Sequence, residues 1–142
     1  MRKRQRLGAY AVCVQGGAVL LSRFTRSGRW TLPGGGVDHG EHPRDAVVRE
    51  VFEETGLAFV VGPLLDVLSH RFEHTDPDGV LVDVHNVQVL FGGVVTGGTL
   101  TFEIGGSSDH AAWIPLADLA ELPRTSAVDV GLSALSPADR PR

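Results

Sequence analysis

The sequence is short of the features that mark secreted, membrane-spanning and nucleic-acid-binding proteins. Cys13 is the only cysteine, so no internal disulfide can form and a reducing cytoplasm is the expected compartment. No apolar run approaches the roughly 18 residues of a membrane span, so no membrane partner is expected. Acidic residues outnumber basic ones by 17 to 13, a formal net charge of −4, which argues against a stable complex with nucleic acid.

The first residues of the chain are basic and lead into an apolar run. Residues 1–6 hold four basic side chains, and with residues 7–14 they superficially resemble a secretory signal. Gln15-Gly16-Gly17 breaks the run without a small-residue cleavage site, so we interpret residues 1–6 as a solvated tail. Residues 7–14 and 18–23 are then predicted to form a hairpin.

The most informative stretch of the chain runs from Gly35 to Leu57. Pro43 suits the first turn of a helix, and Gly56 suits the left-handed position just after its end. We therefore predict a helix over residues 43–55. Helical spacing gives this helix one apolar arc, which is expected to pack, and one acidic arc. The apolar arc holds Val47, Val48, Val51 and Phe52, and the acidic arc holds Glu50, Glu53 and Glu54.

The acidic arc is costly unless a cation binds it. Like charges three or four residues apart repel by about 0.2–0.5 kcal/mol per pair, and acids in the last turn meet the negative end of the helix dipole. A solvated acidic face is the alternative interpretation. Mg2+ takes oxygen ligands, usually carboxylates and substrate phosphates. Gly34, Gly35 and Gly36 precede the helix and permit close backbone approach, so a loop carbonyl could reach the same metal.

These residues resemble the Nudix box, G-x5-E-x7-R-E-U-x-E-E-x-G-U, where U is aliphatic. From Gly35 to Leu57 the chain reads GGVDHGEHPRDAVVREVFEETGL and matches each fixed position. The resemblance, to a generic MutT-like member, implies a small α/β/α sandwich. It also implies that the carbonyl of Gly34 and the carboxylates of Glu53 and Glu54 bind metal, with Glu50 the usual candidate for the base.

Other residues extend the predicted site. Glu50 and Glu53 are assigned to both catalysis and metal binding. Arg49 lies about 100° around the helix from Glu50, so we expect it to orient Glu50 or to pair with Glu41 rather than to touch substrate. Glu41 could join the metal network. Asp109 precedes a W-x-P-L segment and is the predicted further metal ligand or base, with Glu103 as its alternative.

The region after the box is predicted to be a series of strands. Residues 58–68 form a strand candidate with a bend at Gly62-Pro63, and a turn at residues 75–79 joins the strands of a further hairpin. His70 and His74 are interpreted as ordinary histidines, because no third metal ligand lies near them in the sequence.

A final helix is predicted over residues 126–135, with Thr125 as its cap. Strands on both sides of a central helix, followed by a second helix, predict a mixed-sheet α/β fold with two helical layers. A length of 142 residues suits a single domain. We assign residues 7–135 to this domain and residues 136–142 to a C-terminal tail.

The resemblance implies a metal-dependent hydrolase that cleaves the diphosphate linkage of a nucleoside diphosphate bonded to another group. Mg2+ is the expected cofactor, and Mn2+ can substitute. Water attacks phosphorus while the metal polarises the phosphate oxygens and a carboxylate removes the proton. A nucleotide-binding sensor without turnover is the main alternative, and an isomerase or transferase reusing the metal helix is a lesser one.

The substrate is less clearly indicated. Signals of the dinucleoside polyphosphate, NADH and ADP-ribose subgroups are missing outside the box, so we favour nucleoside triphosphates, including oxidised ones. ADP-ribose or a nucleotide sugar is the alternative. Tyr10, Phe24 and Phe72 are candidates for binding the base, although each could equally be a core residue. The expected partner is a small nucleotide, and a homodimer is compatible with the sequence.

Overall fold

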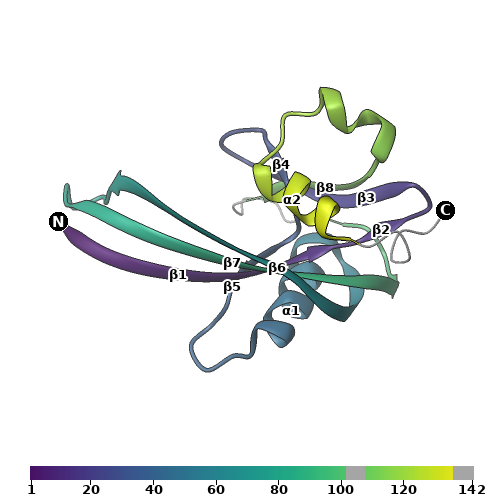
Figure 1. Ribbon diagram of the computed structural model, residues 1–142, viewed down its shortest axis with the longest axis horizontal. Helices are drawn as coiled ribbons and strands as arrows, with labels where there is room; N and C mark the ends of the chain where they lie inside the picture. The colour runs from purple at the N-terminus through teal and green to yellow at the C-terminus, as the bar shows by residue number, and fades with distance from the viewer. Residues whose placement is uncertain (102–107, 136–142) are drawn as a thin grey trace.

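The computed structural model describes residues 1–101 and 108–135, which form two sheets and three helical segments (Figure 1). The first sheet has the order β5 (Gly34–Gly36), β1 (Arg2–Val12), β7 (Leu81–Gly98) and β6 (Leu57–Thr75). In the second, β3 (Ala18–Phe24) pairs with β2 (Val14–Gln15), β4 (Trp30–Thr31) and β8 (Ser108–Pro115). Because β1 and β7 run parallel while β5 and β6 are antiparallel to their neighbours, the first sheet is mixed.

The two faces of β1 and of its continuation to Val14 carry separate cores, because successive side chains of a strand point to opposite faces. Ala9, Ala11 and Cys13 pack with the buried residues of α1 (Pro43–Thr55). Val12 and Val14 pack with those of α2 (Ser126–Ala134). The 3-10 helix η1 (Leu116–Glu121) joins β8 to the segment before α2. Figure 1 shows α1 below the first sheet and α2 above it, so the predicted single-domain α/β/α fold is confirmed.

Helix α1 begins and ends where the sequence predicts. The His42 side chain accepts a hydrogen bond from the Arg44 N–H at 3.0 Å, and Pro43 follows as the first helical residue. Gly56 has φ 75° and donates its N–H to the carbonyl of Phe52 at 2.8 Å. This left-handed end turns the chain directly into β6.

The buried arc of α1 is narrower than the sequence predicted. Val47 and Val51 are completely buried, whereas Val48 is 36% and Phe52 is 61% exposed. The helix packs through Ala46, Val47 and Val51 on β1 and β6, and a residue one position further along the helix points about 100° away from that contact. Val48 and Phe52 therefore lie at the solvent side.

The predicted basic tail is also wrong, because residues 2–6 belong to β1. The backbone pairs in parallel with β7 from Arg2 opposite Val82 onward. Arg2 and Arg4 each form an ion pair at 3.0 Å with Asp76, which lies where β6 turns toward β7. The side chains are exposed as expected, but the backbone is held by a partner strand. The predicted hairpin of residues 7–14 and 18–23 is reduced to the short β2–β3 pair.

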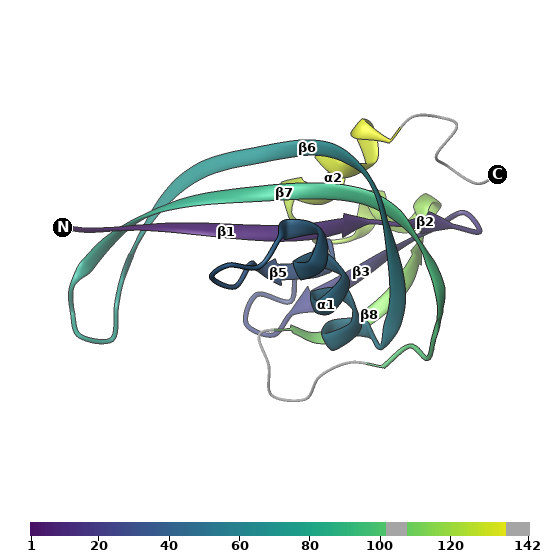
Figure 2. The ribbon, with the colours of Figure 1, turned by 90° about the horizontal axis from the view of Figure 1, so that it is seen from below.

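Strands β6 and β7 form the second predicted hairpin. Register shifts between Val61 and Leu64 mark the expected bend at Gly62-Pro63. Figure 2 shows β6, β7 and the first half of β1 extending together beyond the helices. No helix in the described ranges is long and apolar enough to cross a membrane. The predicted tail over residues 136–142 lies outside the described residues.

Candidate active site

The three glycines form a strand against which two box carboxylates lie. Gly34 is opposite Tyr10 in the β1–β5 pair, and its N–H donates to Glu54 Oε2 at 2.9 Å. A Cβ atom added at Gly35 would lie only 2.6 Å from Glu50 Oε2. The absence of side chains on β5 thus lets the glutamates of α1 approach its backbone.

The Arg49 guanidinium forms hydrogen bonds with the carboxylates of Glu41, Glu50 and Glu53. Its Nε and Nη2 donate to the two carboxylate oxygens of Glu41 at 2.9 and 2.8 Å, a bidentate pair. Nη1 donates to Glu50 at 3.0 Å and to Glu53 Oε2 at 3.2 Å. Nη2 also donates to the carbonyl of Gly36 at 3.0 Å. Arg49 therefore makes the predicted contacts with Glu41 and Glu50, and it also holds β5 to α1.

The Arg49–Glu41 pair shifts both pKa values toward the charged forms. The hydrogen bonds from Arg49, together with one from the Asp38 N–H, lower the pKa of Glu41 to about 2. The same pair, with smaller contributions from Glu50 and Glu53, raises the pKa of Arg49 further above its usual range. The guanidinium therefore stays charged over the whole pH range in which these carboxylates titrate.

The donor atoms around α1 fit a hard divalent cation by their chemistry. Glu50, Glu53 and Glu54 offer carboxylate oxygens on one arc, and the β5 backbone adds carbonyls. Within residues 1–101 and 108–135, no three acidic, histidine or cysteine side chains already converge in a metal-holding cluster. Arg49 engages Glu50 and Glu53, while Gly34 engages Glu54. Metal binding therefore requires these long side chains to rotate from their present partners toward a common point.

A cavity of about 370 Å³ lies on the other side of β1 from α1 and is lined by Tyr10, Phe24 and Phe72 together. The sequence offered these three aromatics separately. Asn86 and Gln88 of β7 line the same cavity, and Gln88 hydrogen-bonds the Tyr10 hydroxyl. Burial raises the pKa of Tyr10, and the charges of Glu54 and Glu50 raise that pKa further. The cavity thus lies close enough to the box for the charges of two box carboxylates to act on the Tyr10 hydroxyl.

The model of the NUDIX domain family matches residues 3–133. The chain belongs to the Nudix family. A crystal structure of a MutT NUDIX hydrolase from Burkholderia pseudomallei is similar at a TM-score of 0.75 and 30% identity, covering 93% of this chain and 98% of that one. This Nudix chain therefore shares both sequence and fold with a solved relative over almost its whole length.

Curated relatives of the Nudix chain match over shorter stretches. A putative mutator protein, MutT4, of Mycobacterium tuberculosis is 35% identical over 104 residues, which is 72% of this chain and 40% of the relative. An RNA pyrophosphohydrolase of Bartonella quintana is 61% identical over 31 residues, 22% of this chain and 18% of the relative. The chain thus spans well under two thirds of the length of these curated relatives.

The predicted site residues outside the Nudix box have mixed outcomes. Asp109 lies in β8 and forms an ion pair with Arg23 of β3 at 2.9 Å, so its role as a metal ligand stays a prediction. Glu103 lies outside the described residues. The His70 ring stacks on Phe72 and the His74 ring lies tilted against it, each with a ring-centre distance of 6.1 Å.

Sequence reasoning missed several lining residues of the cavity. Asn86 and Gln88 lie on β7, Arg6 on β1 and Arg29 just before β4. Only the pairing of β7 with β1 on one side and with β6 on the other brings most of the lining residues together. Thr125 precedes α2 as predicted, but its hydroxyl bonds that of Thr31 at 2.9 Å instead of capping the helix. The alternation of polar residues along β7 was the one usable signal in the sequence.

We expect Glu41 of the Nudix box to titrate near pH 2. Its folded pKa of about 2 lies below the ordinary value of 4.5, so its stabilising contact with Arg49 is complete above about pH 4.5 and is lost as the pH falls toward 2. A carboxyl-detected NMR titration measures this directly. Arg49→Gln should return the midpoint toward the ordinary value. A midpoint near 4.5 in the unaltered protein would contradict the assigned contact.

Proposed function

We propose that this Nudix chain is a metal-dependent pyrophosphohydrolase of nucleoside diphosphates bonded to another group. The observation that carries the proposal is the placement of Glu50 and Glu54 against the glycine strand β5, which lies beside the aromatic-lined cavity across β1. Carboxylates of α1 are suited to the reacting phosphates, and the cavity is suited to the nucleoside. Neither half alone identifies a substrate, but their adjacency fits one extended molecule that spans both.

The proposed metal ligands are Glu53, Glu54 and the carbonyl of Gly34, with Asp109 as a further candidate. A bound Mg2+, or Mn2+ in its place, would neutralise phosphate charge and lower the pKa of the attacking water. Glu50 is the proposed base and takes the proton from that water at a carboxylate oxygen. Arg49 is a positioning residue, because its Nη1 holds the Glu50 carboxylate at 3.0 Å while its other donors anchor Glu41 and Gly36.

The cavity supports a nucleobase as the recognised group. Phe24, Phe72 and Tyr10 contribute aromatic rings to its lining, and aromatic stacking of a base is worth about 1–3 kcal/mol. The amides of Asn86 and Gln88 can donate to and accept from base edges. We propose nucleoside triphosphates, including oxidised ones, as the first substrate class. The mutator name of the Mycobacterium tuberculosis relative supports this choice, and ADP-ribose or a nucleotide sugar is the second class.

A substrate panel tests the proposal. Canonical and oxidised triphosphates, ADP-ribose, NADH and sugar nucleotides are incubated with Mg2+ or Mn2+, and released phosphate and pyrophosphate are measured. We expect turnover of at least one triphosphate, and a loss of about 10²-fold or more in the Glu50→Gln variant. Preference for ADP-ribose or a sugar nucleotide over every triphosphate would overturn the substrate class. Tight binding without turnover of any member would instead indicate a sensor.

A further inference from the structure

The cavity beside the box has basic side chains in its lining. Arg6, Arg29 and His70 line it, and none of its described lining residues is an aspartate or a glutamate. Stacking of a neutral base needs no cation, and the aromatic and amide side chains already provide base contacts. The two arginines are therefore suited to an anionic group of the ligand rather than to its base.

These two arginines also differ from most arginines of the described chain. Six others form ion pairs with carboxylates: Arg2, Arg4, Arg23, Arg49, Arg71 and Arg124. Among the described residues, neither Arg6 nor Arg29 has a carboxylate partner within ion-pair distance, and Arg29 instead donates from Nη2 to the carbonyl of Arg124 at 2.7 Å. That bond fixes the position of Arg29 without neutralising its charge.

The two uncompensated charges reach the cavity from different sheets. Arg6 lies on β1 in a row with Asn86 of β7 and His70 of β6, all on one face of the first sheet. Arg29 directly precedes β4 in the second sheet, next to the bonded hydroxyls of Thr31 and Thr125. A ligand group in this cavity would meet one guanidinium from β1, a second from the residue before β4, and hydroxyl or imidazole donors as well.

Resting on the proposed function, we infer that the substrate carries a second phosphate on the nucleoside held in this cavity, separate from the diphosphate that is cleaved. Guanidinium groups bind phosphate oxygens in paired, charge-assisted hydrogen bonds. The reacting phosphates belong beside α1, where the carboxylates and their cation act, whereas Arg6 and Arg29 lie at the nucleoside end. The second phosphate is either a monoester on the ribose or the diester that joins the next nucleotide of an oligonucleotide.

Matched substrates that differ by one phosphate test this inference. The first pairs are ADP-ribose with its 2′-phosphorylated form, and ATP with its 3′-phosphorylated form. A third pair is ATP with a 5′-triphosphorylated dinucleotide, which carries the diester. We expect kcat/KM to be about 10-fold or more higher for the member with the extra phosphate in at least one pair. Discrimination confined to the third pair assigns the phosphate to an oligonucleotide, and discrimination confined to the first two assigns it to a mononucleotide.

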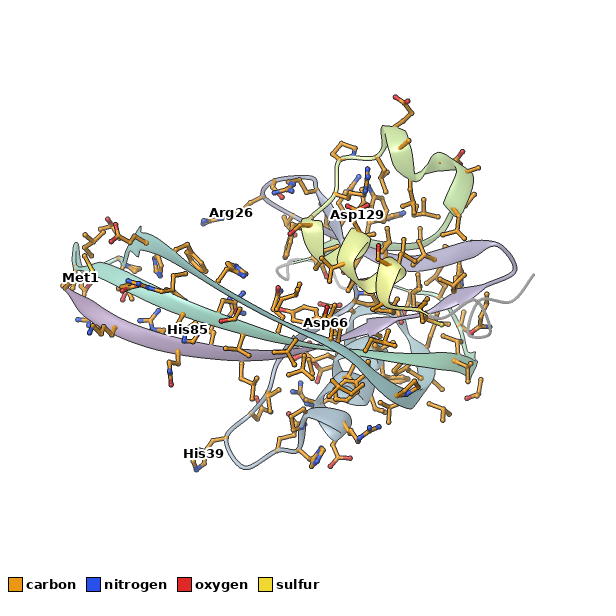
Figure 3. The ribbon with its side chains drawn as sticks, viewed as in Figure 1. Met1, Arg26, His39, Asp66, His85 and Asp129 are labelled. Carbon is orange, nitrogen blue, oxygen red and sulfur yellow. The ribbon has the colours of Figure 1, made fainter. Side chains whose placement is uncertain are left out.

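Variants that remove one positive charge show which arginines cause the preference for the extra phosphate. Arg6→Gln and Arg29→Gln should each bring the ratio of the two kcat/KM values toward one. The matched control is Arg26→Gln, which removes the same charge from an exposed side chain that extends from the β3–β4 loop and does not line the cavity (Figure 3). This control should keep the ratio of the unaltered protein. Circular dichroism of all three variants checks that the fold is intact.

The outcomes separate this inference from the proposed function. Hydrolysis with ratios near one in all pairs would overturn the second phosphate while leaving the pyrophosphohydrolase in place. Equal losses on both members of a pair in the Arg6 and Arg29 variants would mean that these residues contact the cleaved diphosphate, and would also overturn the inference. If no substrate is hydrolysed, calorimetric binding of the same pairs to the unaltered protein decides. Tighter binding of the phosphorylated members supports the inference, and equal binding refutes it.

Discussion

Replacing Glu53 or Glu54 by glutamine is expected to abolish most of the hydrolytic activity. An amide keeps the shape of the carboxylate but loses the charge that a hard cation needs. Because a catalytic metal contributes several kcal/mol to transition-state stabilisation, each variant should lose at least about 10²-fold in kcat. The fold should survive, since the Glu53 side chain is exposed and a glutamine oxygen at position 54 can still accept the Gly34 N–H hydrogen bond.

The measurement combines kcat at saturating Mg2+ with calorimetric titration of the metal. The matched control is Asp45→Asn, which removes an exposed carboxylate from the first turn of the same helix, away from the acidic arc. Its metal affinity and kcat should stay within about twofold of the unaltered protein, as expected of a surface change. Near-native turnover in both glutamine variants would refute the metal assignment.

Alanine at Gly34 is expected to be the most destabilising single change in the site. The new Cβ would lie 2.2 Å from the carbonyl oxygen of Ala9 and 2.6 Å from Cα of Tyr10, and the residue has φ 151°. Both contacts are with backbone, so the β1–β5 pair must separate. We expect a loss of about 3 kcal/mol or more in the free energy of unfolding, measured by urea denaturation.

The two following glycines provide internal controls. A Cβ at Gly36 meets nothing within 4 Å, so Gly36→Ala should change the free energy of unfolding by less than about 0.5 kcal/mol. The three atoms nearest to a Cβ at Gly35 all belong to the end of the Glu50 side chain, which can move. Gly35→Ala should therefore lower kcat by about 10-fold or more, as expected for a displaced base, with little loss of stability. Equal stability across the three variants would contradict the close packing of β5.

Local signals in the sequence were sufficient to predict the bounds of helix α1 and the contacts that Arg49 makes from it. Pro43 and Gly56 act through their own backbone preferences, and Arg49 meets Glu41 and Glu50 because the chain leads directly into the helix. The extent of β1 was not predictable in this way. Its residues 2–6 have the composition of a solvated tail, and their partner strand lies about 80 positions further along the chain.

The cavity was beyond local reasoning for a related physical reason. Tyr10, Phe24 and Phe72 come from three strands in two sheets, so their meeting depends on strand order rather than on spacing. The same holds for Arg6 and Arg29. Among residues 1–101 and 108–135 neither has a carboxylate within ion-pair distance, and only the folded structure shows this.

The parallel pairing of β1 with β7 also determines when the protein can complete its fold. Arg2 pairs with Val82 and Val12 with Gly92, so β1 leaves the ribosome about 80 residues before its partner. Contacts this distant in sequence form late and slowly, and a strand that waits for its partner is exposed to aggregation in the meantime. The alternating arginines at positions 2, 4 and 6 oppose premature strand pairing by like-charge repulsion.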